Sequence, residues 1–207
     1  ESYKFSQCIH VEHPYIENRL SKGHKFDVTT NIFEKLPELF HSQLNPNENE
    51  SDYIKIIGRE NNVRCEKWIK REYINSPDNF VNYKVILPKA NGSGVLGEPL
   101  STPLIGKPYY GHTQTFISVG SFNSYDEADA CIKYIKSKFA RTMLGILKVT
   151  QDNKKEAWRK VPLQDFTSNS DIDWSQSIEN IDQQLYKKYN LSQDEIDFIE
   201  SKVRAMD

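Results

Sequence analysis

Residues 83–122 read YKVILPKANGSGVLGEPLSTPLIGKPYYGHTQTFISVGSF, and the rest of the chain is organised around this stretch. Two strand-like runs, YKVILP from Tyr83 and TFISVGSF from Thr115, enclose an irregular segment rich in Gly, Pro, Ser and Thr. Long irregular connections inside a domain are more often functional or disordered than purely structural. The stretch therefore predicts a recognition surface rather than a catalytic centre.

The same segment contains a glycine pattern, Gly92-x-Gly94-x-x-Gly97, that matches the dinucleotide-binding fingerprint. That fingerprint needs a helix beginning at the glycines, so that the helix N-terminus can hold a pyrophosphate. Pro99 and Pro103 follow the glycines and forbid a regular helix there. No acidic residue stands near the expected position about 20 residues further on. We therefore interpret the glycines as a flexible loop that another backbone can approach closely.

Alternating apolar residues predict strands near residues 53–58, 83–88 and 113–122. We expect an α+β (mixed α/β) fold in which these strands form a central, mostly antiparallel sheet. VRCEKWIKREYI, which starts at Val63, is read as a helix with an aromatic anchor at Trp68. CIHVEH, which starts at Cys8, is read as a strand.

Capping patterns predict the helices of the second half. Ser124-x-x-Glu127 is a capping box that opens a long helix over residues 125–147. Ser177 and Ser192 precede two acidic segments with apolar stripes, which predict a C-terminal helical hairpin. We expect residues 1–164 to form an α/β domain, with the hairpin of residues 165–207 packed on it.

The composition is that of a globular protein. The chain has 207 residues, of which 37% are hydrophobic, 27% charged and 12% aromatic. No apolar run approaches the roughly 18 residues that a membrane span requires, and no signal peptide is evident. The three cysteines are far apart and odd in number, which favours a reducing cytoplasm over a disulfide framework.

The net charge of −2 conceals a basic middle between acidic ends. Residues 53–164 carry 18 basic and 10 acidic side chains, whereas residues 1–52 carry 5 and 9, and residues 165–207 carry 4 and 10. A basic segment of this kind is typical of a polyanion-binding module. Charge scattered over solvated faces gives the same counts.

The candidate DNA contacts fall into two groups. Residues of the central stretch with amides, hydroxyls or basic groups are expected to contact DNA directly: Lys89, Asn91, Ser93, Lys107, His112, Thr113 and Gln114. Basic residues of the flanking elements are expected to contact phosphates: Arg59, Lys67, Arg71, Lys136 and Arg141. A solvated face is the alternative for the second group, and helix-dipole compensation explains part of the charge on residues 125–147.

Other site chemistries are less well supported. Cys8, His10 and His13 could ligate zinc, but no second ligand pair follows, and surface or core histidines are more common. A metal-dependent nuclease needs converging acids and a lysine, and nothing in the sequence ties its acidic residues together. The acidic C-terminal helices could instead make the chain a protein-interaction module.

Several long phrases resemble a known family. TPLIGKPYYGHTQTFISVGSF, KYIKSKFARTMLGILKVTQDN, VPLQDFTSNSDIDWS and IDQQLYKKYNLSQDEIDFIESKV are similar to the C-terminal part of adenine-specific DNA methyltransferases of bacterial type II restriction–modification systems, some of them fused to a nuclease. The similarity covers Tyr83 to the C-terminus, and residues 1–80 match more loosely.

The resemblance implies a target-recognition region without the chemistry. In the family, an upstream domain carries an Asn-Pro-Pro-Tyr type motif and an S-adenosylmethionine loop. Neither is present here, since Asn45-Pro46-Asn47 does not match the motif. The fragment is thus expected to bind no cofactor and to hold no catalytic residue. Its expected partners are double-stranded DNA and the upstream methyltransferase domain, which would flip the adenine, with a nuclease domain as a further candidate.

Overall fold

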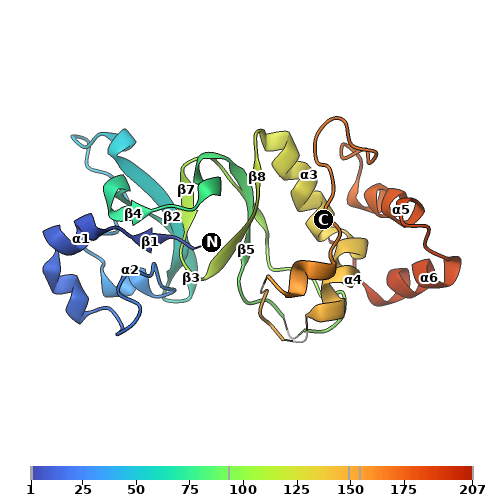
Figure 1. Ribbon diagram of the computed structural model, residues 1–207, viewed down its shortest axis with the longest axis horizontal. Helices are drawn as coiled ribbons and strands as arrows, with labels where there is room; N and C mark the ends of the chain where they lie inside the picture. Colours follow the sequence, from blue (N-terminus) through green and yellow to red (C-terminus); the bar gives the residue numbers. More distant parts are fainter. Residues whose placement is uncertain (1, 93, 149, 154, 207) are drawn as a thin grey trace. The chain divides into compact units, whose positions relative to one another are not determined.

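The computed structural model describes residues 2–92, 94–148, 150–153 and 155–206, and its helices and strands confirm the α+β fold class (Figure 1). The strands are β1 (Lys4–Phe5), β2 (Tyr53–Glu60), β3 (Val63–Lys70), β4 (Ile74–Asn75), β5 (Tyr83–Pro88), β6 (Leu104–Gly106), β7 (Tyr110–His112) and β8 (Phe116–Phe122). The α-helices are α1 (Gln7–Glu12), α2 (Ile32–Lys35), α3 (Tyr125–Lys136), α4 (Lys138–Leu147), α5 (Ile178–Lys188) and α6 (Gln193–Lys202). Short 3-10 helices are η1 (Pro14–Asn18), η2 (Glu50–Asp52), η3 (Arg71–Tyr73), η4 (Asp78–Val81) and η5 (Ala157–Lys160).

Two compact units share the chain, and their segments alternate along it. Unit 1 comprises Glu1–Tyr83 and Gly106–Ser118, and unit 2 comprises Lys84–Ile105 and Val119–Asp207. Each unit has its own hydrophobic core, one around α2 and β2 and the other around α3, α4, α5 and α6. The boundary expected at residue 164 lies inside unit 2, because α5 packs on α3 and α4, and α6 packs on α4.

The strands form three small sheets, with strand orders β1-β4, β3-β2-β7 and β6-β5-β8. The strands expected to share one central sheet are therefore divided, since β2 belongs to a different sheet from β5 and β8. The run expected as one strand over residues 113–122 is also divided. A turn closed by a 3.0 Å hydrogen bond from the Phe116 N–H to the Thr113 carbonyl separates β7 from β8.

The helix expected after Val63 is wrong, because this segment is strand β3. It pairs antiparallel with β2 along its whole length, with Arg59 opposite Arg64 and Lys55 opposite Trp68. Asn61 and Asn62 connect the strands with φ of 49° and 63°. A two-residue loop with both φ angles positive matches the twist of a hairpin, and asparagine tolerates it well. The loop chemistry therefore selects the hairpin over a helix.

The strand expected for CIHVEH is likewise wrong, because residues 7–12 form α1. The predicted helix over residues 125–147 is interrupted at Ser137, whose ψ of 150° is extended. The Ser137 hydroxyl accepts the Ala140 N–H, and the Asp182 carboxylate of α5 accepts the N–H groups of Lys138 and Phe139 at 3.0 and 2.9 Å. A new helix, α4, begins here because both caps satisfy its first donors.

The C-terminal helices are present where the sequence places them. Ser177 accepts the Asn180 N–H at the start of α5, and Ser192 forms a complete capping box with Glu195 at the start of α6. In Figure 1 both helices lie on the far side of α3 and α4 from β8, within unit 2. Among the described residues, no helix is long and apolar enough to cross a membrane.

We predict that Gly97→Ala destabilises the fold far more than Gly23→Ala. Both glycines have left-handed φ, of 68° and 85°, but a Cβ at Gly97 would overlap the Val203 side chain, whereas a Cβ at Gly23 meets nothing within 4 Å. The expected losses of unfolding free energy are about 2–4 kcal/mol for Gly97→Ala and about 1 kcal/mol for Gly23→Ala. Urea unfolding followed by circular dichroism measures both. Equal losses would contradict the close contact with Val203.

Candidate nucleic-acid interface

The β3-β2-β7 sheet of unit 1 has two chemically different faces. Its inner face carries Ile54, Ile56 and Ile69, all at most 2% exposed, and packs on Phe33 of α2. A Cβ added at Gly58 would lie 2.6 Å from the Phe33 ring, so only glycine allows this approach. Because side chains alternate along a strand, the intervening residues must project to the other side.

On that other side we define the outer face as Lys55, Arg59, Arg64, Glu66, Trp68 and Tyr110; Ile57 and His112 lie on the same side and are buried. Its centre is a cluster of charged and aromatic groups. The Lys55 amine lies 4.7 Å from the Trp68 ring centroid and 3.5 Å from Glu66 Oε2. The Tyr110 hydroxyl donates to Glu66 Oε1 at 2.6 Å. Burial, and then the Glu66 carboxylate, raise the pKa of Tyr110, so its hydroxyl stays a neutral donor.

Two arginines stand side by side at the turn end of the outer face. Arg59 and Arg64 are direct cross-strand partners. The Arg64 guanidinium lies over the Phe116 ring, 5.3 Å from its centroid. Arg59 is exposed and forms no ion pair with any of the described residues. The turn end of the sheet therefore presents two guanidinium groups, of which that of Arg59 is exposed.

A second basic cluster lies at the opposite end of the strands. Arg71 stands over the Tyr109 ring at 4.8 Å from the centroid, and Tyr109 is 48% exposed with a φ of 62°. Lys107 is exposed two residues earlier. An arginine held against an aromatic ring keeps its charge and its N–H edge available to a ligand.

Lys67, expected to contact phosphate, lies on the inner face. It is 7% exposed, and its amine donates to Glu60 Oε1 at 2.6 Å and lies over the Phe33 ring. The expectation fails because it assumed a helix, in which Lys67 and Arg71 would share one face. In a strand, residue 67 points with Cys65 and Ile69 into the core.

His112 and Thr113 are also buried, at 2% and 0% exposure, and the Thr113 N–H donates to the Ile57 carbonyl at 2.9 Å. Both residues lie in the interior of unit 1 and not at its surface. Gln114 is half-buried, and its side chain hydrogen-bonds the Asp27 carboxylate. Of this predicted trio, only Gln114 has surface that a ligand could reach.

The glycine loop is tied into unit 2 by its polar groups. Asn91 is 4% exposed, its amide donates to the Pro99 carbonyl at 3.0 Å, and its oxygen accepts the Ser101 N–H. The Lys148 amine donates to the Asn91 carbonyl at 2.7 Å. Asn91 therefore holds the loop in place, which removes it from the expected direct contacts.

Arg141, expected to contact phosphate, is 2% exposed. Its guanidinium donates to the carbonyl oxygens of Lys136, Gly97 and Arg204. Burial lowers the pKa of Arg141, and the three carbonyls satisfy its donors. Arg141 is thus a structural cross-link in unit 2.

The remaining predicted contacts of unit 2 are Lys89, Lys136 and Ser93. Lys89 is exposed and Lys136 is half-buried at the last residue of α3. Ser93 lies outside the described residues. Both lysines belong to unit 2, whereas Arg59, Arg71, Lys107 and Gln114 belong to unit 1.

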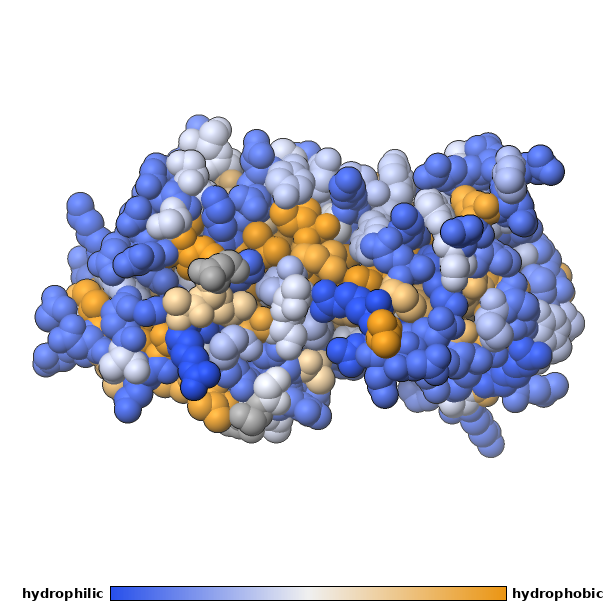
Figure 2. All heavy atoms as spheres, turned by 180° about the vertical axis from the view of Figure 1, so that it is seen from behind, coloured by the Kyte–Doolittle hydropathy of each residue, from blue (hydrophilic) through white to orange (hydrophobic). Residues whose placement is uncertain are grey.

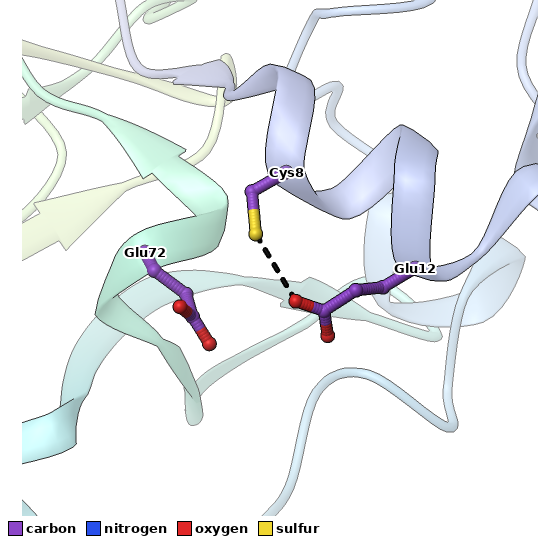
Figure 3. Close-up of side chains that lie close together, drawn as sticks. All are labelled: Cys8, Glu12 and Glu72. Carbon is purple, nitrogen blue, oxygen red and sulfur yellow. Dashed lines mark hydrogen bonds between the residues drawn. The ribbon is translucent and has the colours of Figure 1, made fainter.

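Cys8, His10 and His13, the zinc ligands considered and disfavoured from the sequence, form no group of metal ligands in the described part of the chain. Cys8 and Glu12 lie one turn apart on α1 and approach Glu72, with the Cys8 thiol donating to Glu12 at 3.1 Å (Figure 3). His10 instead packs its ring on Phe26. The hydrogen bond to Glu12, together with burial, raises the pKa of Cys8, which disfavours the thiolate that metals need.

The acids considered for nuclease chemistry are likewise apart from one another. In the described part of the chain, Asp52, Glu60 and Asp78 form no group of metal ligands, and Glu60 is bonded to Lys67. The face seen in Figure 2 is mostly hydrophilic, with hydrophobic residues gathered in patches. An apolar hollow of ≈ 370 Å³ between α4 and α6 has no basic side chain in its lining, so it does not suit a polyanion.

The sequence reasoning missed four residues of the outer face, namely Lys55, Arg64, Trp68 and Tyr110, and it also missed Tyr109, which precedes β7. A signal for most of them was present. YIKIIGRE and VRCEKWIK both alternate with a period of two, and the two asparagines between them are typical of a hairpin turn. Reading both runs as strands places Lys55, Arg59, Arg64 and Trp68 on one face. No local signal gives the positions of Tyr109 and Tyr110 relative to that face.

Comparisons of the chain with models of known protein families, with characterised proteins and with solved structures find no significant match.

We predict that the Asp27 carboxylate makes the free energy of unfolding decrease in acid. Burial by itself raises the pKa of its carboxyl, but hydrogen bonds from Lys4, His24 and Gln114 outweigh burial and lower the pKa to about 2. A folded-state pKa below the ordinary 3.8 means that the ionised form stabilises the fold above pH 4 and that this contribution is lost as pH falls towards 2. Asp27→Asn should cost about 1–2 kcal/mol at pH 7 and nothing near pH 2.

Urea unfolding of both proteins between pH 7 and pH 2 checks this prediction. Asp52→Asn, at an exposed position of η2, is the control and should change the unfolding free energy by less than about 0.5 kcal/mol at every pH. A cost for Asp27→Asn that is the same at pH 7 and pH 2 would contradict the assigned shift.

Proposed function

We propose that this chain binds double-stranded DNA in a sequence-specific manner through the outer face of unit 1, as the specificity part of a cytoplasmic restriction–modification enzyme that methylates adenine. The observation that carries the proposal is the row of cations and aromatic rings along the β3-β2-β7 sheet. Lys55 with Trp68 and Arg59 with Arg64 lie on the outer face, and Arg71 with Tyr109 follows the end of β3 outside the strands.

The dimensions of the row suit a duplex. At about 3.3 Å per residue, β2 runs about 20 Å between Tyr53 and Arg59. A duplex carries one negative charge per ≈ 1.7 Å of its axis, so several phosphates fall within that length. Cations spread along one strand can therefore contact the backbone at more than one point.

The aromatic rings give the cations their positions. The ring contacts of Lys55, Arg64 and Arg71 restrict the motion of long side chains that would otherwise lose entropy on binding. Such restriction lowers the cost of forming charge-assisted bonds to phosphate oxygens. The outer face is thus prepared for an anionic ligand in the absence of DNA.

The proposal assigns no chemistry to this chain. Methyl transfer and S-adenosylmethionine binding would belong to an upstream domain of the parent enzyme, and a nuclease domain could be a further part of it. In this division of roles, the outer face positions the duplex while another domain extrudes the adenine.

We predict that the chain binds a 30-base-pair duplex at 50 mM salt and that the logarithm of the binding constant falls linearly with the logarithm of the salt concentration. Arg71→Ala should weaken all sequences alike, by roughly 2–5-fold, and reduce the magnitude of the salt slope by about 1, because one phosphate contact is lost. Fluorescence anisotropy over a salt series measures both quantities.

Lys22→Ala is the matched control, because Lys22 is an exposed lysine of unit 1 outside the β3-β2-β7 sheet and should leave affinity and slope unchanged. The absence of binding to any duplex at 50 mM salt would favour the protein-interaction module. Magnesium-dependent cleavage of plasmid that is abolished by changing Asp52, Glu60 or Asp78 would favour the nuclease.

A further inference from the structure

We propose that the apolar hollow between α4 and α6 is a docking site for an amphipathic helix of another polypeptide, one that carries basic residues beside its apolar face. We call this site the α4–α6 hollow and define it by its apolar lining residues Phe139, Met143, Leu191, Phe198 and Ile199. The inference does not depend on the proposed binding of duplex DNA, because the hollow belongs to unit 2 and the outer face to unit 1.

The deeper lining of the α4–α6 hollow belongs to the core of unit 2. Phe139 and Ile199 are 3% and 5% exposed, and Met143 and Leu191 pack against the same core. The Phe139 ring stacks on the Tyr189 ring, with centroids 4.8 Å apart. Packing within unit 2 thus holds these groups without a ligand. The hollow of ≈ 370 Å³ is therefore preformed, which lowers the cost of receiving an apolar side chain.

Apolar side chains at the edges of the hollow are left in contact with solvent. Phe198 of α6 is 48% exposed. On α4, Phe139, Met143 and Ile146 follow the spacing i, i+4, i+7 and share one helical face, and Ile146 is 54% exposed. In Figure 1, α6 lies beside α4, and the two helices are in contact. Exposed apolar groups gathered on two adjacent helices are typical of an interaction site.

The shape of this site suits a third helix. Amphipathic helices bind by laying apolar side chains at i, i+3 or i+4, and i+7 into an apolar groove between elements of a partner. The 10 residues of α4 extend over about 15 Å, which matches about three turns of such a helix. Met143 and Phe198 are residue types that contact partners well, because methionine adapts its shape and aromatic rings bury a large area.

The charge around the hollow decides which kind of helix fits. Asp194 and Glu195 line it and are exposed, and none of the described residues in its lining is basic. Hydrogen bonds from the Ser192 N–H and hydroxyl lower the pKa of Glu195, so its carboxylate is ionised at neutral pH. Over its whole length α6 carries four acids and one base: Asp194, Glu195, Asp197, Glu200 and Lys202. Lysine or arginine beside the apolar face of a partner is attracted to this rim, and acids there are repelled.

The same acids disfavour two other occupants. A two-fold contact between copies of this chain places the same patch on both sides, so Asp194 and Glu195 of one copy would lie close to those of the other. The anionic lipids of a membrane surface would be repelled in the same way. A basic amphipathic helix meets both the apolar lining and the acidic rim.

The probe for this site is a synthetic helix of about 15 residues, with leucines at i, i+4 and i+7 and with lysines and alanines elsewhere. One matched peptide has glutamates in place of the lysines, and another has serines in place of the leucines. We expect the full chain to bind the lysine–leucine peptide and to bind each matched peptide at least about 10-fold more weakly. Fluorescence anisotropy of labelled peptides measures the three affinities. Equal affinity for the lysine–leucine peptide and either matched peptide would overturn the inference.

Phe198→Ala tests the apolar part of the site. It should weaken binding of the lysine–leucine peptide by about 5–30-fold, because it removes the exposed aromatic ring of the hollow. Leu163→Ala is the matched control, since Leu163 is 93% exposed, belongs to unit 2 and lies outside the hollow, and it should leave the affinity unchanged. Equal losses for the two variants would overturn the assignment of the site.

Asp194→Lys tests the acidic rim. It should weaken the lysine–leucine peptide and strengthen the glutamate–leucine peptide, each by about 3–10-fold. A gain in affinity cannot come from misfolding, so this variant tests the site even if the truncation at Phe198 lowers stability. Glu156→Lys reverses an exposed acid of unit 2 outside the hollow and should change neither affinity. The same response from both charge reversals would show a general charge effect and overturn the inference.

Two further measurements separate this inference from its alternatives. Dimerisation in sedimentation that Phe198→Ala abolishes would assign the hollow to a second copy and overturn the basic helix. Duplex affinity, measured in parallel, should be unchanged by Phe198→Ala, and peptide affinity should be unchanged by Arg71→Ala. A wild-type chain that binds duplex but not the lysine–leucine peptide refutes this inference alone, and one that binds the peptide but no duplex refutes the proposed function alone.

Discussion

The contact between Gly58 and Phe33 fixes the architecture of unit 1. A backbone without a Cβ lets β2 settle onto α2, and this close approach decides which side of the sheet is buried. Once that side is set, alternation along β2 and β3 places successive side chains on opposite faces of the sheet. A slip of one residue would bury Arg59 and Lys55 and expose Ile56, at a large cost in desolvation. The chemistry of the outer face thus depends on packing at the inner one.

Unit 2 uses polar groups for a different purpose. Its glycine loop contains no helix in the described part, and it is held by amide, ammonium and guanidinium groups that bond to backbone carbonyls. These bonds satisfy carbonyls that an irregular segment would otherwise leave without partners. A basic or amide side chain near a loop is therefore ambiguous in sequence, because it can hold the loop from within or contact a ligand from outside. Asn91 and Arg141 do the first.

The two faces of the hairpin differ in the charged side chains that they carry and in the partners of those side chains. On the inner face, Lys67 and Glu60 pair with each other, and the surrounding groups are apolar. On the outer face, Arg59 and Arg64 are direct cross-strand partners, and Lys55 and Arg64 lie over the aromatic rings of Trp68 and Phe116. This difference is our reason for placing recognition on the outer face.

The sequence by itself determined the fold class, strands β2 and β5, and the starts of α3, α5 and α6, because alternation and serine caps are local signals. Only the tertiary structure decided that Ser137 divides α3 from α4 and which candidate contacts reach the surface. Both depend on partners distant in sequence: Asp182 for the start of α4, and the Gly97 carbonyl for Arg141. Exposure is a property of packing, which no single stretch of sequence encodes.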